Sequence, residues 1–230
     1  MSKEDALDVT VKRHVTNNPE ENAVNKELKL PLGEQFEKDL TEIMDSDIEA
    51  SGETVVIALI DLDKFLGVNK DYGTQAGDKV LIDTGKYLQS KIRKDSLLYR
   101  IGGDEFAIIF RGTEEREEIF LELENIRREY NVKCPDGRPV SITIGMATAY
   151  EDAGRCPELV RKAESALYRA KVGGSNRVAM AKEEKMIPKT SHYTQDQLQR
   201  LAKLAKKEGV GEAILLREAL DVLLKKYDNI

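Results

Sequence analysis

Long apolar runs are absent from this sequence, and so is tryptophan. A membrane-spanning helix needs roughly 20 consecutive apolar residues, so the sequence predicts no membrane span. The polar amino terminus does not have the pattern of a secretory signal peptide, and we therefore expect a cytoplasmic protein. Hydrophobic residues make up 40% and charged residues 34% of the chain, a composition that is typical of soluble globular proteins.

Cysteine is also scarce, with Cys134 and Cys156 as the only two. Their spacing matches no metal or redox motif, which favours free thiols in a reducing compartment. The length of 230 residues suits one medium domain with a real core plus a small additional module.

Carboxylates are concentrated at two points where apolar runs end. The stretch Arg100–Phe106 places Gly-Gly, Asp104 and Glu105 between two apolar runs, which predicts a tight hairpin with negative charge at its bend. Upstream, the apolar run 55–60 predicts a buried strand that ends in Asp61-Leu-Asp63. Acidic groups in this arrangement are a usual way to hold Mg²⁺ against the phosphates of a nucleotide. An ordinary exposed β-turn is the alternative for Gly-Gly-Asp taken alone.

Five separated motifs together resemble the GGDEF family of diguanylate cyclases. In chain order they are Leu59–Phe65, Asn69, Gly73–Leu81, Arg100–Phe106 and Ala163–Val178. The resemblance covers roughly residues 28 to 181. It implies a palm-like, ferredoxin-related α+β domain, and it implies an enzyme that condenses two GTP molecules into cyclic di-GMP and pyrophosphate.

The resemblance also implies a set of metal ligands. Asp61, Asp104 and the backbone carbonyl of Leu62 would bind Mg²⁺ or Mn²⁺, and Glu105 would support the metals or the attacking hydroxyl. Asp63 is either a further ligand or a structural residue.

Substrate recognition is implied at further positions. Backbone amides of the turn from Asp63 through Phe65 to Leu66 would hold the terminal phosphates, and Lys171 would neutralise them. Asn69 and Asp78 would recognise guanine, since an amide and a carboxylate complement its edge. Without the family pattern, Asn69 would be interpreted as a turn residue, Asp78 as a charge at a helix N-terminus and Lys171 as a solvated helix residue.

The sequence departs from the family at several phosphate-binding positions. Leu66 replaces a usual Lys, Thr74 a usual His and Ser175 a usual Arg, so the site has lost positive charge and turnover is expected to be slow. Family product inhibition uses Arg-x-x-Asp. Here Arg93 is a remnant of that inhibitory site, but Ser96 occupies the Asp position, which predicts weak inhibition.

Periodicity predicts the order of the remaining elements. An amphipathic helix should run through Leu40 and Met44, and later segments predict strands at 97–101, 105–111, 140–147 and 177–181 and helices at 80–92, 114–130 and 156–171. Strands that alternate with helices around one hairpin indicate an α+β sheet with helices on it. We expect a polar, flexible segment at 1–26, the GGDEF domain at 27–181, a linker at 182–188 and a separate module at 189–230.

The carboxy-terminal segment predicts one short strand at 190–193 and two helices, the first capped by Thr194 and ended by Gly209. One strand and two helices in about 45 residues cannot close a core without a second copy. The segment 189–198, with Gly209-Val210 and Arg217–Leu220, is similar to ribbon-helix-helix proteins, a family that dimerises through an intermolecular ribbon and commonly binds DNA.

DNA binding by this module is a weaker prediction than dimerisation. From Lys185 onward, nine Lys and Arg stand against six Asp and Glu, about +3, whereas the rest of the chain has 27 against 36, or −9. Alternation would place Lys189, Ser191 and Tyr193 on the outer, DNA-facing side of the strand. One cation per strand is few for a DNA reader. His192 would be an inward, packed residue.

The sequence therefore predicts a cytoplasmic diguanylate cyclase that is dimerised by its carboxy-terminal module, with GTP as substrate and no membrane partner. Two alternatives stay open. One is a catalytically weak or inactive regulator that binds GTP or cyclic di-GMP and acts on DNA. The other is a palm-type cyclase with a different base preference.

Overall fold

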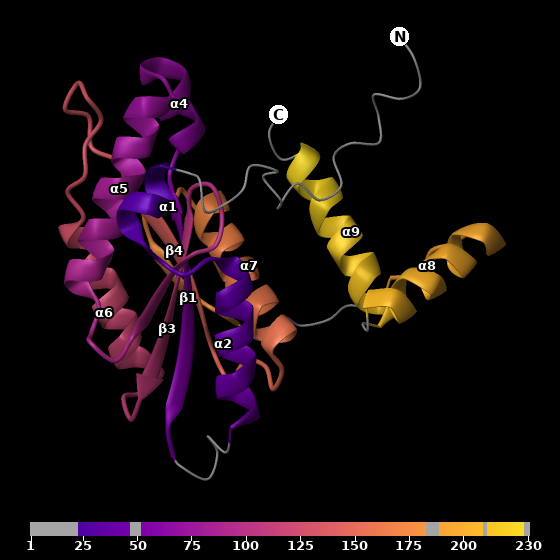
Figure 1. Cartoon of the computed structure of the whole chain (residues 1–230). Helices are drawn as coiled ribbons and strands as arrows, with labels where there is room; N and C mark the ends of the chain where they lie inside the picture. Colours follow the sequence, from indigo (N-terminus) through magenta and orange to yellow (C-terminus); the bar gives the residue numbers. More distant parts are fainter. Residues whose placement is uncertain (1–22, 47–51, 183–188, 209–210, 228–230) are drawn as a thin grey trace. The chain divides into compact units, whose positions relative to one another are not determined.

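The computed structural model describes residues 23–46, 52–182, 189–208 and 211–227. The chain divides into two compact units, residues 1–183 and 184–230, which are described separately below (Figure 1). The described residues do not include residues 1–22 of the predicted polar segment, residues 183–188 of the predicted linker, or Gly209, the predicted end of a helix.

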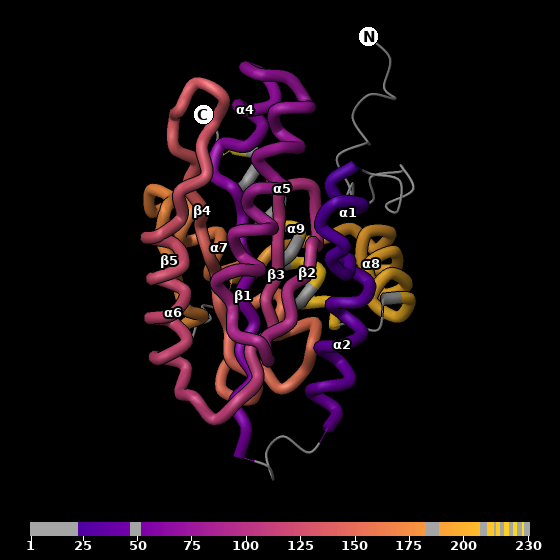
Figure 2. Tube along the Cα trace, turned by 60° about the vertical axis from the view of Figure 1, so that its left-hand side comes forward, coloured from indigo at the N-terminus to yellow at the C-terminus, as the bar shows by residue number. Residues whose placement is uncertain are grey.

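The first unit is built on a five-stranded sheet in the order β2-β3-β1-β4-β5, which can be followed in Figure 2. The strands are β1 (Thr54–Leu62), β2 (Leu97–Arg100), β3 (Glu105–Gly112), β4 (Ile142–Thr148) and β5 (Val178–Met180). All neighbours are antiparallel except β4 and β5, which are parallel.

Strand β1 is the central strand of the sheet, and both of its faces are buried. Alternate residues enter two different clusters: Val56, Ala58 and Ile60 pack on one side of the sheet and Ile57 and Leu59 on the other. This two-residue period on two apolar faces explains why the strand reads as a continuous hydrophobic run.

Helices cover both faces of the sheet, with α1, α5 and α6 on one side and α2 and α7 on the other (Figure 1). Their bounds are α1 (Ala23–Leu28), α2 (Gly33–Asp45), α4 (Phe65–Tyr72), α5 (Thr74–Lys91), α6 (Arg116–Glu129) and α7 (Cys156–Val172). The predicted mixed sheet with surrounding helices is thus confirmed. Helix α4, in the segment after Asp63, was not predicted.

Helix α7 packs unusually close to β4. A Cβ at Gly145 would lie within van der Waals overlap of the backbone of Ala163 and Leu167, so only glycine permits this approach. The close packing fixes the height of α7 over the sheet, and with it the position of Lys171 in its last turn.

The start of the first unit differs from the prediction. Residues 23–26 were assigned to the polar amino-terminal segment, yet they belong to α1, and Val24 is fully buried with Leu28 in the core. Two apolar residues four positions apart form a stripe too short to stand out among charged neighbours. Only the packing of α1 on α5 reveals it.

The second unit contains α8 (Gln195–Glu208) and α9 (Glu212–Tyr227). Thr194 caps α8 as predicted: its Oγ1 accepts from the Gln197 backbone N–H at 3.2 Å, and its own N–H donates to Gln197 Oε1 at 2.9 Å. Residues 190–193 form no strand in this single chain. A ribbon strand needs a partner strand, so that prediction is open.

Candidate active site

The end of β1 and the Gly-Gly turn lie side by side. Asp61 is the register partner of Glu105 across β1 and β3, and the Leu62 N–H donates to the Asp104 carbonyl at 3.3 Å. The turn is closed by the Ile101 N–H, which donates to the Glu105 carbonyl at 3.0 Å. Three acidic residues from segments about forty positions apart are therefore neighbours, as the sequence predicted.

Glycine at position 102 leaves room for the Glu105 side chain. A Cβ there would come within 2.6 Å of Glu105 Oε2, so a larger residue would shift the flexible end of Glu105 from its place over the turn. The motif thus combines a turn preference with space for the Glu105 carboxylate.

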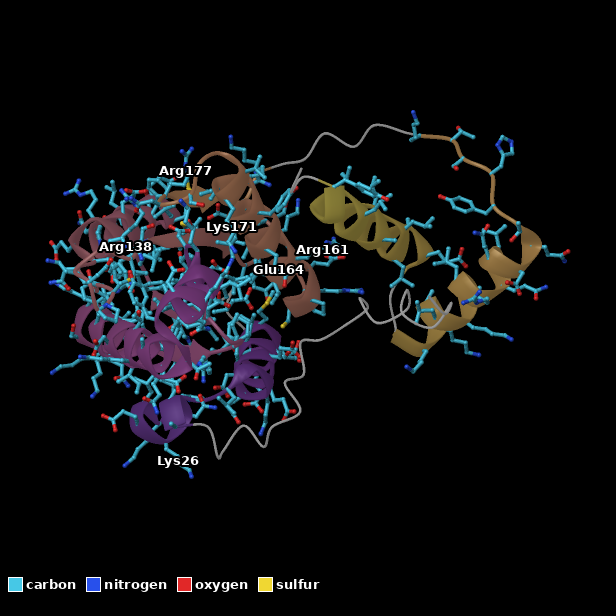
Figure 3. The ribbon with its side chains drawn as sticks, turned by 90° about the horizontal axis from the view of Figure 1, so that it is seen from above. Lys26, Arg138, Arg161, Glu164, Lys171 and Arg177 are labelled. Carbon is cyan, nitrogen blue, oxygen red and sulfur yellow. The ribbon has the colours of Figure 1, made fainter. Side chains whose placement is uncertain are left out.

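Asp61 is nearly buried and pairs with Lys171, whose Nζ lies 2.6 Å from Asp61 Oδ2. Lys171 is labelled in Figure 3. Burial, with smaller contributions from the neighbouring Asp104 and Glu105, raises the pKa of Asp61 to about 6, and Lys171 offsets only part of this rise. A buried carboxylate with this surplus of negative charge favours an additional cation.

A cavity of about 430 Å³ opens beside these acids. Its walls come from α4, α5 and the Gly-Gly turn, and its lining residues are Phe65, Leu66, Asn69, Thr74, Asp78, Leu81, Arg100, Gly103 and Asp104. All four residues predicted to bind substrate between positions 65 and 78 line the same cavity as Asp104. Gly77 supports this arrangement, because a Cβ there would overlap the side-chain oxygen of Asn69.

Arg100 is a site residue to which the sequence analysis gave no role. Its side chain is buried, its Nη2 donates to the Gly103 carbonyl at 2.7 Å, and its Nη1 donates to Asn25. Burial lowers the pKa of Arg100, and Asp78 and Asp104 counteract this. The guanidinium holds the Gly-Gly turn to α1 and lines the cavity. Arginine at the end of an otherwise apolar strand was the available signal.

Asp63 belongs to a different network from Asp61. Its carboxylate accepts from Ser141 Oγ and Thr143 Oγ1, both at 2.6 Å, and from the Asn176 N–H at 3.1 Å. These donors occupy both oxygens, which favours the structural interpretation of Asp63.

Arg93 is held by acidic residues of its own chain. It pairs with Glu114, its Nε lies 3.2 Å from Glu122 Oε2, and its guanidinium stacks over Phe110 at 5.5 Å from the ring centre. Ser96 is buried nearby. The remnant of the inhibitory motif thus takes part in internal ion pairs.

A metal at this site would depend on few protein side chains. In the part of the chain that the structure describes, no three His, Cys, Asp or Glu side chains form a metal-binding group. Asp61, Asp104 and the Leu62 carbonyl nevertheless supply the oxygen donors that Mg²⁺ prefers, and Mg²⁺ usually completes its shell with water and phosphate oxygens. The residues therefore fit a magnesium ion that arrives with a nucleotide.

The candidate DNA-facing residues of the second unit are Lys189, Ser191 and Tyr193, and all three are exposed. His192, which was expected to be packed inward, is also exposed in the single chain. None of the described helices is both long and apolar enough to span a membrane.

Both units of the chain match a known protein family. Residues 29–177 match the family described as diguanylate cyclase, GGDEF domain, and residues 187–228 match a ribbon-helix-helix domain. Diguanylate cyclase A of Treponema denticola is 34% identical over 149 residues, which cover 62% of this chain and 39% of that protein. Diguanylate cyclase DgcP of Pseudomonas aeruginosa is 34% identical over 134 residues, which cover 56% of this chain and 20% of that protein. The chain therefore spans well under half the length of these relatives.

Solved structures show the same fold. The GGDEF domain of TpbB from Pseudomonas aeruginosa superposes with a TM-score of 0.64 at 28% identity, covering 68% of this chain and 99% of that one. The coiled-coil and GGDEF domain of DgcB from Caulobacter crescentus, solved in complex with c-di-GMP, gives a TM-score of 0.61 at 27% identity and covers 68% and 84% of the two chains. The chain therefore belongs to the GGDEF family of diguanylate cyclases, and it carries a ribbon-helix-helix domain at its carboxy terminus.

Proposed function

We propose that the protein condenses two GTP molecules into cyclic di-GMP and pyrophosphate where two GGDEF domains face each other. The observation that supports this most directly is that Asp104 lines the same cavity as Asn69 and Asp78, next to the register pair Asp61 and Glu105. Each domain would hold one GTP, and the 3′-hydroxyl of each nucleotide would attack the α-phosphate of the other.

Asp61, Asp104 and the Leu62 carbonyl would hold Mg²⁺ or Mn²⁺. The chemistry supplied by such a bound ion is neutralisation of phosphate charge and acidification of the 3′-hydroxyl. Glu105, paired in register with Asp61, would orient the hydroxyl or accept its proton.

Lys171 has two roles in this proposal. In the metal-free chain its ammonium group neutralises Asp61 at 2.6 Å. If that carboxylate held a metal, the ammonium group would be available for the β- and γ-phosphates, since the Lys171 side chain is partly exposed. One lysine would therefore keep the empty site stable and bind the substrate in the filled one.

Guanine would be recognised by Asn69 and Asp78, which reach the cavity from α4 and α5 respectively. A carboxylate accepts from the N–H edge of guanine, whereas adenine offers no matching pair of donors there. This favours GTP over ATP.

Turnover should be slow. Leu66 replaces a cation at the cavity and is 81% exposed, and Thr74 and Ser175 supply no charge. Among the residues proposed to contact phosphate, Lys171 then supplies the positive charge, so phosphate binding should depend strongly on the metal.

The ribbon-helix-helix domain would provide the dimer. The described residues of the second unit expose a series of large apolar side chains, namely Tyr193, Leu198, Leu204, Leu220, Leu223, Leu224 and Tyr227. A second copy of the same segment would bury them, and the linked GGDEF domains would then share a high effective concentration. The mildly basic module and the exposed Lys189 keep DNA as a second candidate partner.

Incubating purified protein with Mg²⁺ or Mn²⁺ and each nucleoside triphosphate, followed by mass analysis of the products, tests the proposal. We expect cyclic di-GMP and pyrophosphate from GTP and no such products from the other nucleoside triphosphates. Binding of GTP without any product would favour the inactive regulator, and a different cyclic dinucleotide would overturn the base assignment.

A further inference from the structure

The loop after α7 has an unusual backbone. Ser175 and Asn176 are consecutive non-glycine residues with φ of 57° and 46°, in the left-handed region that most side chains avoid. Asparagine tolerates this region better than most residues, whereas serine does so less readily. Two such residues in succession persist only when their surroundings hold them in place.

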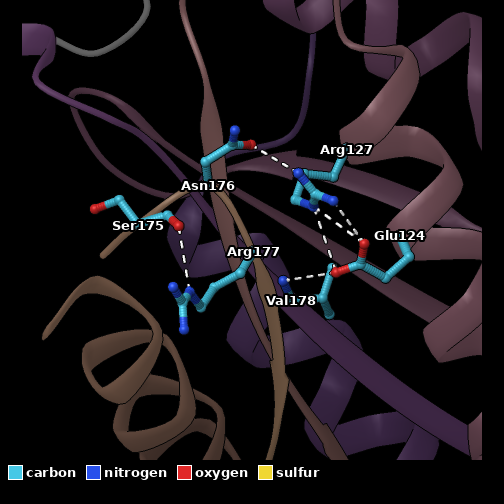
Figure 4. A network of polar contacts seen from close by, with 6 residues as sticks. All are labelled: Glu124, Arg127, Ser175, Asn176, Arg177 and Val178. Carbon is cyan, nitrogen blue, oxygen red and sulfur yellow. Dashed lines mark hydrogen bonds and ion pairs between the residues drawn. The ribbon is translucent and has the colours of Figure 1, made fainter. Parts of the chain in front are cut away.

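An ion pair on α6 holds this loop from one side. Arg127 Nη1 donates to Asn176 Oδ1 at 2.8 Å, and Arg127 Nη2 donates to Glu124 Oε2 at 2.7 Å. Glu124 also accepts from the Val178 N–H at 3.0 Å (Figure 4). Burial opposes ionisation of Glu124, but the donors from Arg127 and Val178 prevail and lower its pKa. We call Glu124, Arg127 and their contacts to the loop the α6 brace.

The other side of the loop contacts the candidate active site. The Asn176 N–H donates to Asp63 Oδ2 at 3.1 Å and to Thr143 Oγ1 at 2.8 Å. The Asp63 N–H in turn donates to the Ser141 carbonyl at 2.9 Å. Asp63 begins the turn that is proposed to hold the terminal phosphates, and it directly follows Leu62. Asn176 therefore links the α6 brace to the phosphate turn.

The beginning of the same loop fixes the end of α7. The Gly174 N–H donates to the Lys171 carbonyl and the Ser175 N–H to the Ala170 carbonyl, both at 3.1 Å. Movement of the loop would therefore displace Lys171 as well as the Asp63 turn. These are the two parts of the proposed phosphate site, and no hydrogen bond among the described residues connects the Lys171 side chain to Asp63 directly.

We propose that Asn176, held by the α6 brace, is a positioning residue that sets the distance between Lys171 and the Asp63–Leu66 turn so that both reach one triphosphate. This rests on the proposed function for its substrate, GTP. In the proposal the side-chain amide matters as well as the backbone conformation, because Oδ1 is the atom that Arg127 holds.

Two substitutions at one position separate these roles. Asn176→Gly keeps access to the left-handed backbone and removes Oδ1. Asn176→Asp tolerates the same backbone and keeps an oxygen for Arg127. We expect Asn176→Gly to weaken binding of Mg²⁺-GTP about tenfold, because small misplacements of positioning groups have effects of this size or larger. Calorimetric titration would measure the affinity. Asn176→Asp should bind within about twofold of the unchanged protein.

Two arginines on α6 supply a matched pair of variants. Arg127→Gln breaks the brace, including the 2.7 Å ion pair from Arg127 to Glu124. Arg116 is on the same helix, and Arg116→Gln breaks an ion pair to Glu151 that is also 2.7 Å long. Glu151 follows β4 at the end opposite Thr143, which pairs with Asp61. Arg127→Gln should reproduce the weaker binding of Asn176→Gly, and Arg116→Gln should not.

Hydrogen exchange without nucleotide or metal gives a measurement independent of the reaction. We expect faster exchange of the amides at 63–66 in Arg127→Gln and Asn176→Gly than in Arg116→Gln, with melting temperatures recorded for all variants. The proposal is overturned if Asn176→Gly matches the unchanged protein in binding and exchange, or if Arg116→Gln has the same effects as Arg127→Gln. If the unchanged protein neither binds nor converts GTP, the proposed function fails, and the exchange data still decide whether the brace holds the turn.

Discussion

The two units of this chain differ in how they bury apolar side chains. In the first unit, two clusters of buried residues fill both sides of the sheet. In the second, Ala205 is the one buried apolar residue among those that the structure describes, and most large side chains of α8 and α9 are exposed. The first unit therefore has the core of an independent domain, whereas the described residues of the second have large apolar side chains but bury few of them in a single copy.

In the proposed dimer, each unit would gain from a second copy for its own reason. The second unit would gain burial, since two helices in about 45 residues rarely stabilise themselves. The first unit would gain its reaction partner, since one cavity would hold one of the two nucleotides in the proposed reaction. A single association through the second unit would meet both requirements.

The largest expected effect separates chemistry from folding within the first unit. Asp104→Ala removes a proposed metal ligand from a turn, so product formation should fall about a thousandfold or more, comparable to the loss of other transition-state-stabilising groups. The melting temperature should change little. Asp95→Ala, in an exposed turn before β2, is the control and should retain activity. Turnover near that of the control in Asp104→Ala would show that the metal assignment is wrong.

A second substitution tests the incomplete core of the second unit. Leu220 is 53% exposed in the single chain, and Leu220→Asp would place a carboxylate in the proposed dimer interface, where an unpaired charge is strongly unfavourable. We expect monomers by light scattering and about tenfold slower synthesis at sub-micromolar protein, where tethering matters most. Gln199→Asp adds the same charge at an exposed site on α8 and should leave the dimer intact. Equal behaviour of the two variants would argue against this interface.

Asp61 and Asp63 are separated by one residue, and replacing each with asparagine should shift the melting temperature in opposite directions. The pKa of Asp61 is raised to about 6 by burial, so the folded state binds its proton more tightly than the unfolded chain does. The contribution of Asp61 to stability therefore falls as the pH rises from about 4 to about 6. In metal-free protein, Asp61→Asn should raise the melting temperature at pH 7.5 and raise it less at pH 4.5.

Asp63→Asn should have the reverse effect, because it replaces an acceptor of three hydrogen bonds. Loss of buried hydrogen bonds of this kind destabilises proteins by about 1–3 kcal/mol, or several degrees in melting temperature. Thermal unfolding of both variants at the two pH values gives the comparison. Stabilisation by Asp63→Asn would contradict its assignment as a structural residue.

The smallest expected effect concerns product inhibition. Arg93 is engaged by Glu114 and Glu122, and Ser96 supplies no carboxylate. Added cyclic di-GMP at micromolar concentration should therefore change the initial rate little, as measured by pyrophosphate release. Strong inhibition at sub-micromolar product would show that the internal ion pairs of Arg93 open to bind it.

The arrangement of the site was predictable to the extent that it depends on local pattern. The apolar run of β1 and the Gly-Gly turn are recognisable in short windows, and they are sufficient to predict that Asp61 and Asp104 lie close together. Asn69 and Asp78 depended on the family resemblance, because a turn residue and a helix charge have no distinctive pattern of their own.

What escaped prediction depends on contacts that are distant in sequence. Arg100 meets Asn25 across 75 positions, and Asn176 meets Asp63 across 113. No periodicity records such pairs, and each residue alone has an ordinary solvent-exposed interpretation. The burial of Val24 escaped for the same reason, since it is created by packing on α5.

The most direct test of the account compares the full chain with a chain truncated after Lys182, across a series of protein concentrations. Light scattering and product formation would be measured on the same samples. We expect the full chain to be a dimer with a rate proportional to its concentration. The truncated chain should be a monomer that still binds GTP, with a much lower rate that rises as the square of protein concentration. A truncated chain that remains dimeric and equally active would contradict the account and would show that GGDEF domains pair without the ribbon-helix-helix domain.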